Sequence, residues 1–209
     1  MSKGMIFDVD GVLIYTAIDY PREIVKKIIK RLGYGEFSFK KVDRFWWGDS
    51  DVSRRELIEL EFKVKFEDFI GLFEGYVKDF EHAKNFKGVY GEVIPVLDEL
   101  KRRGISLGIV TDAPSYIAIP QLDYFFNDNY FSEIVMTHGL ENVRDKPEPD
   151  GILLCMGRMG VNDCAFIGDS DSDIVAAKKA GIEAILIDRG EHETYVEPDR
   201  KLKTLKELL

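Results

Sequence analysis

The sequence has 209 residues, of which 45% are hydrophobic and 32% are charged, as is usual for a globular protein with a sizeable core. Its 29 basic and 38 acidic residues give a net charge of −9. This balance argues against general nucleic-acid binding, which depends on clustered Lys and Arg.

Five short apolar segments are predicted to be buried strands. They are GMIFDV (4–9), ISLGIVT (105–111), EIVMT (133–137), CAFIGD (164–169) and EAILID (183–188). Most are apolar at nearly every position rather than at alternate ones. This pattern is typical of parallel strands that helices cover on both faces.

Amphipathic helices are predicted between these strands. The segment 91–104 places its apolar residues on one helical face and ends at Gly104. The segments 148–160 and 172–181 also end in glycine, the residue that most often terminates a helix. Strands that alternate with helices predict an α/β fold with a doubly wound, Rossmann-like parallel sheet.

Residues 15–84 contain no convincing buried strand. Helical patterns fill this region instead, at 21–33, 53–63 and 66–80. Roughly seventy residues exceed what a simple crossover between two strands requires. We therefore predict an inserted α-helical domain at 15–87 within a core of 1–14 and 88–209, with hinges near 14–17 and 85–91.

Polar residues follow the first four predicted strands in chain order. They are Asp8, Asp10 and Gly11, then Thr111 and Asp112, then Lys146 on a loop, and finally Asp169, Asp171 and Asp173. Open α/β sheets bind ligands beyond the carboxyl ends of their strands. The sequence thus predicts that these side chains meet in one site.

These residue types suit phosphoryl transfer. A carboxylate can attack phosphorus, and a second one can protonate the leaving oxygen and later deprotonate water. Clustered acids require a cation, and an all-oxygen ligand set favours Mg²⁺. A hydroxyl and an ammonium can bind the charged phosphoryl oxygens, while a glycine allows close backbone approach.

The stretches DVDGVL, IVTD, KPEP and GDSDSD resemble the four motifs of the haloacid dehalogenase-like (HAD) hydrolase superfamily. They occur in the family's order, and the resemblance covers essentially the whole chain. The helical insertion stands where the family carries its C1-type cap. Within the family, the chain resembles the phosphoglycolate phosphatase and beta-phosphoglucomutase types.

The resemblance implies how the acidic residues divide the chemistry. Asp8 would be the nucleophile and a Mg²⁺ ligand. Asp10 would be the general acid and base, with its backbone carbonyl on the metal. Asp169 would be a further metal ligand, and Asp173 a ligand or a support for one. Because dehalogenases usually lack the second acid, Asp10 argues against dehalogenation.

The resemblance also implies a phosphate-binding set of Gly11, Thr111, Asp112 and Lys146. Two positions depart from the family's usual pattern. Tyr15 stands where many phosphatases have an acid, and Asp112 stands where many have Asn. We hypothesise that the Asp112 carboxylate disfavours an acidic leaving group.

The favoured function is a Mg²⁺-dependent phosphatase that hydrolyses a small phosphorylated metabolite through an aspartyl-phosphate. A phosphomutase acting on a sugar phosphate is the alternative, because both would use Asp8 and Asp10. A phospho-aspartate receiver is disfavoured, since receivers are about half this size and are modified at the third strand. A non-catalytic binding module would be expected to lack some of the acids or Lys146.

Other residues allow two interpretations. Trp46 and Trp47 are neighbours that could wall a substrate cleft or pack inside the inserted domain. Arg54, Arg55 and His138 could touch substrate, but a surface position is the simpler expectation.

The cellular setting is also predicted from the sequence. We expect Cys155 and Cys164 to be reduced core residues, because two cysteines do not make a disulfide framework. The N-terminal stretch lacks the apolar region of a signal peptide, and no run approaches a membrane span. We therefore expect a cytoplasmic protein without nucleic-acid or membrane partners, either a monomer or a homodimer.

Overall fold

The predicted strands form one parallel sheet in the computed structural model, which describes residues 3–34, 38, 40–43, 54–126, 130–190 and 193–209. The strand order is β5-β4-β1-β6-β7-β8. The bounds are Lys3–Phe7 for β1, Ser106–Thr111 for β4, Glu133–Met136 for β5, Asp163–Gly168 for β6, Glu183–Ile187 for β7 and Arg200–Leu202 for β8. The predicted α/β fold with a parallel sheet is thereby confirmed. The three-residue edge strand β8 was not predicted, because it is short and mostly exposed.

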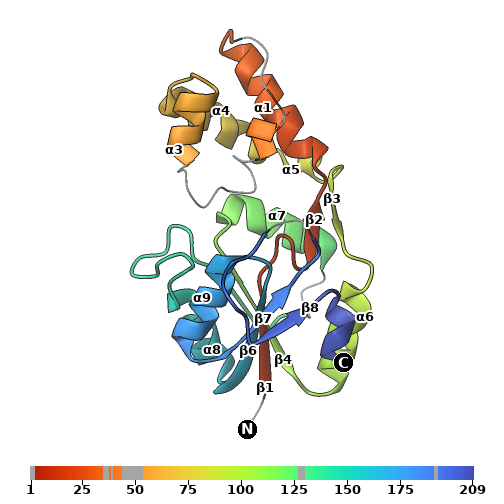
Figure 1. Cartoon of the computed structure of the whole chain (residues 1–209). Helices are drawn as coiled ribbons and strands as arrows, with labels where there is room; N and C mark the ends of the chain where they lie inside the picture. The colour runs from red at the N-terminus through yellow and green to blue at the C-terminus, as the bar shows by residue number, and fades with distance from the viewer. Residues whose placement is uncertain (1–2, 35–37, 39, 44–53, 127–129, 191–192) are drawn as a thin grey trace. The chain divides into compact units, whose positions relative to one another are not determined.

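Helices cover both faces of this sheet, because successive residues of a strand point to opposite sides. Ile6 of β1 belongs to a core cluster with residues of α8 and α9, whereas Phe7 belongs to a second cluster with residues of α6, α7 and the 3₁₀ turn η2. Figure 1 shows α8 and α9 on one side of the sheet and α6 on the other. The bounds are Val93–Arg102 for α6, Ser115–Phe125 for α7, Asp150–Met159 for α8, Asp171–Ala180 for α9 and Leu205–Leu208 for η2.

Helix α7 is not predicted by the sequence pattern. Its apolar residues form only a weakly amphipathic pattern, and Pro120 lies inside it. Proline usually interrupts helices, so the local sequence argued against one here. Tertiary packing of buried residues such as Leu122 overrides that preference.

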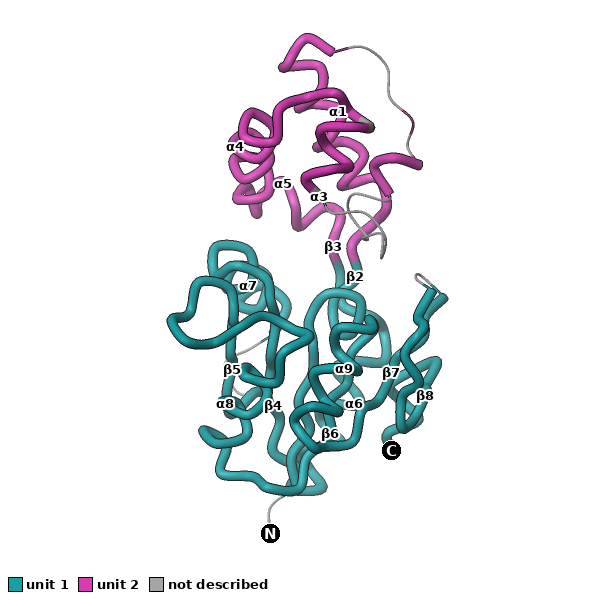
Figure 2. Tube along the Cα trace, turned by 60° about the vertical axis from the view of Figure 1, so that its left-hand side comes forward, with its two compact units in different colours: residues 1–15, 88–209 teal, residues 16–87 magenta. Residues whose placement is uncertain are grey.

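The chain divides into two compact units, residues 1–15 with 88–209 and residues 16–87 (Figure 2). It leaves the first unit in β2 (Ile14–Thr16) and returns in β3 (Lys87–Val89), which pair as a two-stranded sheet. Tyr15, which we placed at the start of the inserted domain, belongs to the first unit.

The unit of residues 16–87 is helical. Its elements are α1 (Asp19–Arg31), α3 (Arg54–Glu56), the π-helical turn η1 (Leu57–Glu61), α4 (Phe66–Val77) and α5 (Phe80–Ala83). Helix α1 packs against α4, and the rings of Phe62 and Phe69 stack at 5.8 Å. The predicted helix 53–63 is therefore one short α-helical turn followed by a π-helical turn. Trp46 and Trp47 lie outside the described residues.

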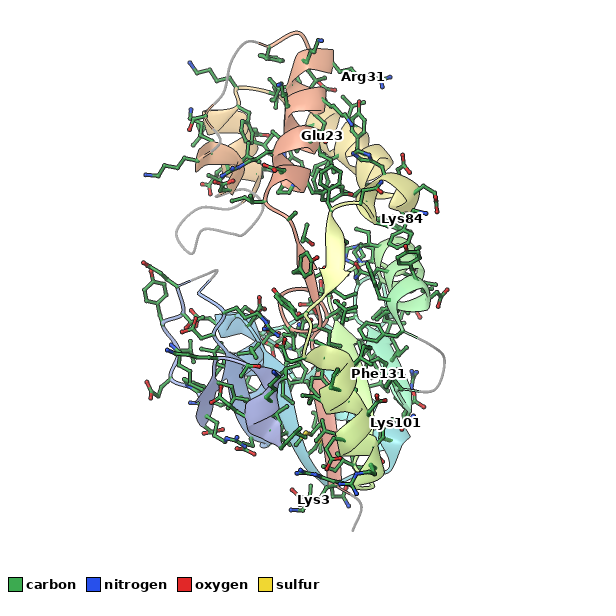
Figure 3. All side chains as sticks on the ribbon, turned by 90° about the vertical axis from the view of Figure 1, so that its right-hand side faces the viewer. Lys3, Glu23, Arg31, Lys84, Lys101 and Phe131 are labelled. Carbon is green, nitrogen blue, oxygen red and sulfur yellow. The ribbon has the colours of Figure 1, made fainter. Side chains whose placement is uncertain are left out.

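The two ends of the sheet differ in character. Figure 3 shows Lys3, at the start of β1, and Lys101, near the end of α6, at the same end of the first unit. The strands' carboxyl ends lie at the opposite end, because all six strands are parallel.

Among the described residues, no helix combines the length and apolar character that crossing a membrane requires.

Candidate active site

Asp8 is fixed at the carboxyl end of the central strand. It follows β1 directly, and its N–H donates to the Ile167 carbonyl on β6 at 2.9 Å. The residue is 7% exposed. Burial raises the pKa of its carboxyl group well above the usual value; the ammonium of Lys146 opposes this shift, and the negative charges of Asp173 and Asp169 add to it. Asp8 is therefore a nearly buried carboxyl that needs positive charge beside it in order to ionise.

Lys146 supplies positive charge to this site. Its Nζ lies 2.7 Å from Asp8 Oδ1 and 2.6 Å from Asp173 Oδ1, and its side chain is 6% exposed. Burial alone would lower the pKa of this ammonium, but the carboxylates of Asp173, Asp8 and Asp112 outweigh burial and raise the pKa well above its usual value. Lys146 is thus held charged between two carboxylates.

The loop between β6 and α9 brings the remaining acids. Asp173 lies in the first turn of α9, where its Oδ2 accepts hydrogen bonds from the N–H groups of Asp169 and Ser170 at 3.2 and 3.1 Å. The Ser170 hydroxyl also donates to this oxygen at 2.6 Å. The Asp173 N–H donates in return to the Ser170 hydroxyl at 3.4 Å, which completes a capping box and satisfies free N–H groups at the start of the helix. Asp173 therefore uses one oxygen to shape the loop that carries Asp169 and the other to bind Lys146.

Three carboxylates converge in a manner that suits a divalent cation. Oxygen atoms of Asp8, Asp169 and Asp173 all lie within 4.8 Å of one another. Among these acids and Lys146, three carboxyl groups lie around one ammonium, so the group holds more acidic than basic side chains. Oxygen-only donors of this kind favour Mg²⁺. The cluster's composition, burial and charge thus fit the predicted metal.

Asp10 and Gly11 lie in the tight turn that follows Asp8. The Gly11 N–H donates to the Ile14 carbonyl at 2.8 Å, and Gly11 has a positive φ of 79°. The amide Nε2 of Gln121, a fully buried residue of α7, lies 3.5 Å from Asp10 Oδ2. Gln121 was not identified from the sequence, since the helix that carries it was not predicted.

Thr111 is the last residue of β4, the neighbour of β1, and Asp112 follows it directly. The buried Thr111 accepts a hydrogen bond from the Ala113 N–H at 3.1 Å. Asp112 Oδ1 lies 2.7 Å from the Thr137 hydroxyl and accepts a hydrogen bond from the Lys146 N–H at 3.3 Å. The Asp112 carboxylate is thus engaged with the loop that carries Lys146.

The Thr137 hydroxyl lies between two acids. Its Oγ1 is 2.7 Å from Asp112 Oδ1 and also 2.7 Å from Asp145 Oδ1. A hydroxyl has one proton to donate, so it can satisfy one carboxylate unless another proton is shared within the group. Burial raises the pKa of Asp112, whereas Lys146 and the Thr137 hydroxyl lower it. Thr137 was not singled out from the sequence, although it ends the predicted segment 133–137.

Arg55 and His138, the described residues that could touch substrate, both have exposed side chains. Arg55 is exposed and pairs with Glu59 and Glu67 at 3.1 and 2.9 Å. His138 is exposed beside Asp145. Tyr15 packs edge-on against Tyr90, with ring centroids 5.5 Å apart. Cys155 and Cys164 are free and buried, as predicted.

Comparison with known proteins covers nearly the whole chain. A family model described as haloacid dehalogenase-like hydrolase matches residues 5–187. The phosphoglycolate phosphatase of Escherichia coli is 25% identical over 233 residues, which cover 99% of this chain and 91% of the relative. Phosphoglycolate phosphatase 1 of Pseudomonas aeruginosa is 28% identical over 199 residues, which cover 91% and 71%. The crystal structure of a HAD phosphatase from Thermococcus onnurineus superposes on this chain with a TM-score of 0.71 and is 27% identical to it in sequence. The match covers 99% of this chain and 95% of that one.

Proposed function

We propose that this chain, which belongs to the haloacid dehalogenase-like hydrolase family, is a Mg²⁺-dependent phosphatase of a small phosphorylated metabolite. The observation that carries the proposal is the group of Asp8, Lys146, Asp169 and Asp173 beyond the carboxyl ends of the strands. Asp8, Asp173 and the Lys146 side chain are buried, and Asp169 is half-buried. Lys146 together with a bound divalent cation would supply the positive charge that the phosphoryl oxygens require.

The first step forms a bond between Asp8 and phosphorus. An Asp8 carboxylate oxygen attacks the phosphorus atom, the bond to the leaving oxygen breaks, and Asp10 donates its proton to that oxygen. Lys146 neutralises charge on Asp8 and on the phosphoryl oxygens, while the Thr111 hydroxyl binds one of these oxygens. The products of this step are an aspartyl-phosphate and the free alcohol.

The second step releases phosphate. A water molecule attacks the phosphorus of the aspartyl-phosphate, and the now ionised Asp10 removes a proton from it. The bond between phosphorus and the Asp8 oxygen breaks, which leaves inorganic phosphate and restores both acids. One carboxylate therefore acts as acid and then as base.

The carboxylates of Asp8 and Asp169, together with the backbone carbonyl of Asp10, would hold the Mg²⁺ ion, and Asp173 would support them. When bound, the ion supplies positive charge that stabilises the phosphoryl oxygens in the transition state. Gly11 leaves the backbone free to approach the phosphoryl group.

We further propose that the helical unit of residues 16–87 acts as the cap that selects the substrate. Its place in the chain, between β2 and β3, supports this role. The relatives named phosphoglycolate phosphatase make 2-phosphoglycolate the first metabolite to test. The hydrogen bonds of Asp112 to Thr137 and to the Lys146 N–H favour a role in holding the Lys146 loop over a role in discriminating leaving groups.

Hydrolysis of p-nitrophenyl phosphate tests the proposal. Activity should require Mg²⁺ and should vanish in Asp8→Asn, while the unfolding midpoint shows that the variant is folded. Full activity in folded Asp8→Asn would refute the assignment of the nucleophile. A panel with 2-phosphoglycolate and sugar phosphates then identifies the substrate, and an isomerised sugar phosphate in place of free phosphate would indicate the phosphomutase alternative.

A further inference from the structure

Arg189 is the second residue after β7, at the same end of the parallel sheet as the candidate active site. Its Nε donates to the Gly11 carbonyl at 3.1 Å, and its Nη2 donates to the Val12 carbonyl at 2.9 Å. Its Nη1 lies 2.8 Å from Glu92 Oε1. The side chain is only 11% exposed, so these bonds form largely out of water.

The two carbonyls belong to the turn that follows Asp10. The backbone N–H groups of this turn bond within it: Gly11 donates to Ile14 at 2.8 Å, and Leu13 donates to Val9 at 2.9 Å. The carbonyls of Gly11 and Val12 point instead to Arg189. Buried carbonyls require donors, and a guanidinium supplies several in one plane. Arg189 thus fixes the outer side of the turn.

The same guanidinium holds the segment by which the chain returns to the first unit. It lies 3.5 Å from the centroid of the Tyr90 ring, which in turn packs against Tyr15 of β2. Tyr90 follows β3 directly, and Glu92 lies just before α6. Burial would raise the pKa of Glu92, but its hydrogen bond from Arg189 and the arginine's charge contribute to a pKa below the usual value. Glu92 is therefore held as an anion beside Arg189.

We propose that Arg189 is a positioning residue for the reaction, which acts by holding the turn after Asp10 so that the Asp10 carboxyl is aimed at the leaving oxygen. This inference rests on the proposed phosphatase function and adds a residue to it. Lysine is not an equivalent replacement, because one ammonium cannot reproduce the planar fork that reaches two carbonyls and a carboxylate. The role thus depends on the shape of the side chain as well as on its charge.

The test compares two kinds of leaving group. An alkyl phosphate needs a proton from Asp10 as its oxygen departs, whereas the nitrophenolate of p-nitrophenyl phosphate leaves without one. The quantity measured is kcat/KM with saturating Mg²⁺ for both substrates, in wild type, Arg189→Lys and Glu92→Gln. Arg103→Lys is the matched control, because Arg103 also donates to a glutamate, Glu99, and to the backbone oxygen of Leu209. Arg103 follows α6 directly, and Lys101, in the last turn of that helix, lies at the other end of the first unit (Figure 3).

Misplacement of a general acid lowers rates steeply, so Arg189→Lys should lose roughly tenfold more kcat/KM on the alkyl phosphate than on p-nitrophenyl phosphate. Glu92→Gln should show the same pattern with a smaller loss, and it serves as the test should Arg189→Lys fail to fold. Arg103→Lys should retain wild-type values. In protein that already carries Asp10→Asn, adding Arg189→Lys should lower kcat/KM for the alkyl phosphate little further. Both substitutions act through the Asp10 carboxyl, so their effects should not add.

The inference would be overturned if Arg189→Lys lowered kcat/KM equally for both substrates, or if folded Arg189→Lys kept wild-type kinetics. It would also be overturned if the losses of kcat/KM from Arg189→Lys and Asp10→Asn were additive. These outcomes are distinct from a failure of the proposed function. If wild-type protein released no phosphate in the presence of Mg²⁺, the phosphatase proposal itself would be refuted, and the inference that rests on it would fall with it.

Discussion

A Cβ atom placed on Gly11 would lie 1.9 Å from Oδ2 of Asp169, so the turn after β1 and the loop after β6 are in direct contact. The positive φ of Gly11, 79°, is a conformation that residues with a Cβ adopt at a cost. Glycine at this position therefore meets two needs, since it permits the turn and leaves room for a carboxylate proposed to bind the metal.

Gly11→Ala should weaken Mg²⁺ binding about tenfold or more, because the new methyl group must displace the Asp169 carboxylate and a shift of that size at a metal ligand has large effects. The measurement is the Mg²⁺ concentration that gives half of the maximal thermal stabilisation. Gly104→Ala is the matched control: its φ is 75°, but no atom lies within 4 Å of the added Cβ. Unchanged Mg²⁺ affinity in folded Gly11→Ala would contradict the prediction.

Lys146→Met should destabilise the metal-free protein by about 3–5 kcal/mol, the usual cost of removing one partner from a buried ion pair. The loss should shrink when Mg²⁺ is added, because the cation then supplies charge to Asp8 and Asp173. Urea unfolding with and without Mg²⁺ measures both effects.

The control for that experiment is Lys3→Met. Lys3 pairs with Asp163 at 3.9 Å on the exposed far end of β1, and such surface pairs contribute about 0–1 kcal/mol. Equal losses of stability in the two variants would show that burial at Lys146 does not matter. Phosphatase activity should vanish in Lys146→Met alone.

Asp112→Asn should alter the pH dependence of stability. Burial raises the pKa of Asp112 in the folded protein, so between its unfolded and folded pKa values the folded state binds more protons than the unfolded state. The free energy of unfolding of the wild type should therefore fall as pH rises through this window. Asn keeps the oxygen acceptor but does not titrate. The difference in free energy of unfolding between wild type and Asp112→Asn should therefore shrink as pH rises.

Urea unfolding without metal over the weakly acidic range measures this difference. Thr137→Ser, which keeps the hydroxyl between Asp112 and Asp145, should retain the wild-type slope. If the difference in free energy of unfolding between wild type and Asp112→Asn stayed constant with pH, Asp112 would have the same pKa in the folded and unfolded states.

The two thiols should react only after unfolding. Burial raises the pKa of both Cys155 and Cys164 to about 12, so little thiolate forms at mildly alkaline pH. Alkylation by iodoacetamide should be slow in the native protein and fast in urea, as followed by mass spectrometry. Rapid native labelling of either residue would contradict the buried positions of these thiols.

The sequence predicted the sheet and the residue types of the site because both depend on local patterns. Runs such as 105–111 are apolar at nearly every position and end in polar residues, which indicates buried parallel strands with ligands at their ends. It did not predict α7, where Pro120 weakens the helical pattern, and so it missed Gln121 beside Asp10. Arg189 also follows a predicted strand, and attention to the fifth strand end could have found it.

The sequence by itself determined which chemical groups stand at the strand ends, since hydrophobic periodicity and glycine positions are properties of neighbouring residues. Only the tertiary structure decided which of them meet. Lys146 reaches Asp8 across 138 positions, and Arg189 reaches Val12 across 177. Such contacts depend on the order and register of the strands, here β4-β1-β6-β7, which the apolar pattern of each strand does not encode. The physical reason is that burial fixes which residues lie inside, whereas strand order fixes which of them are neighbours.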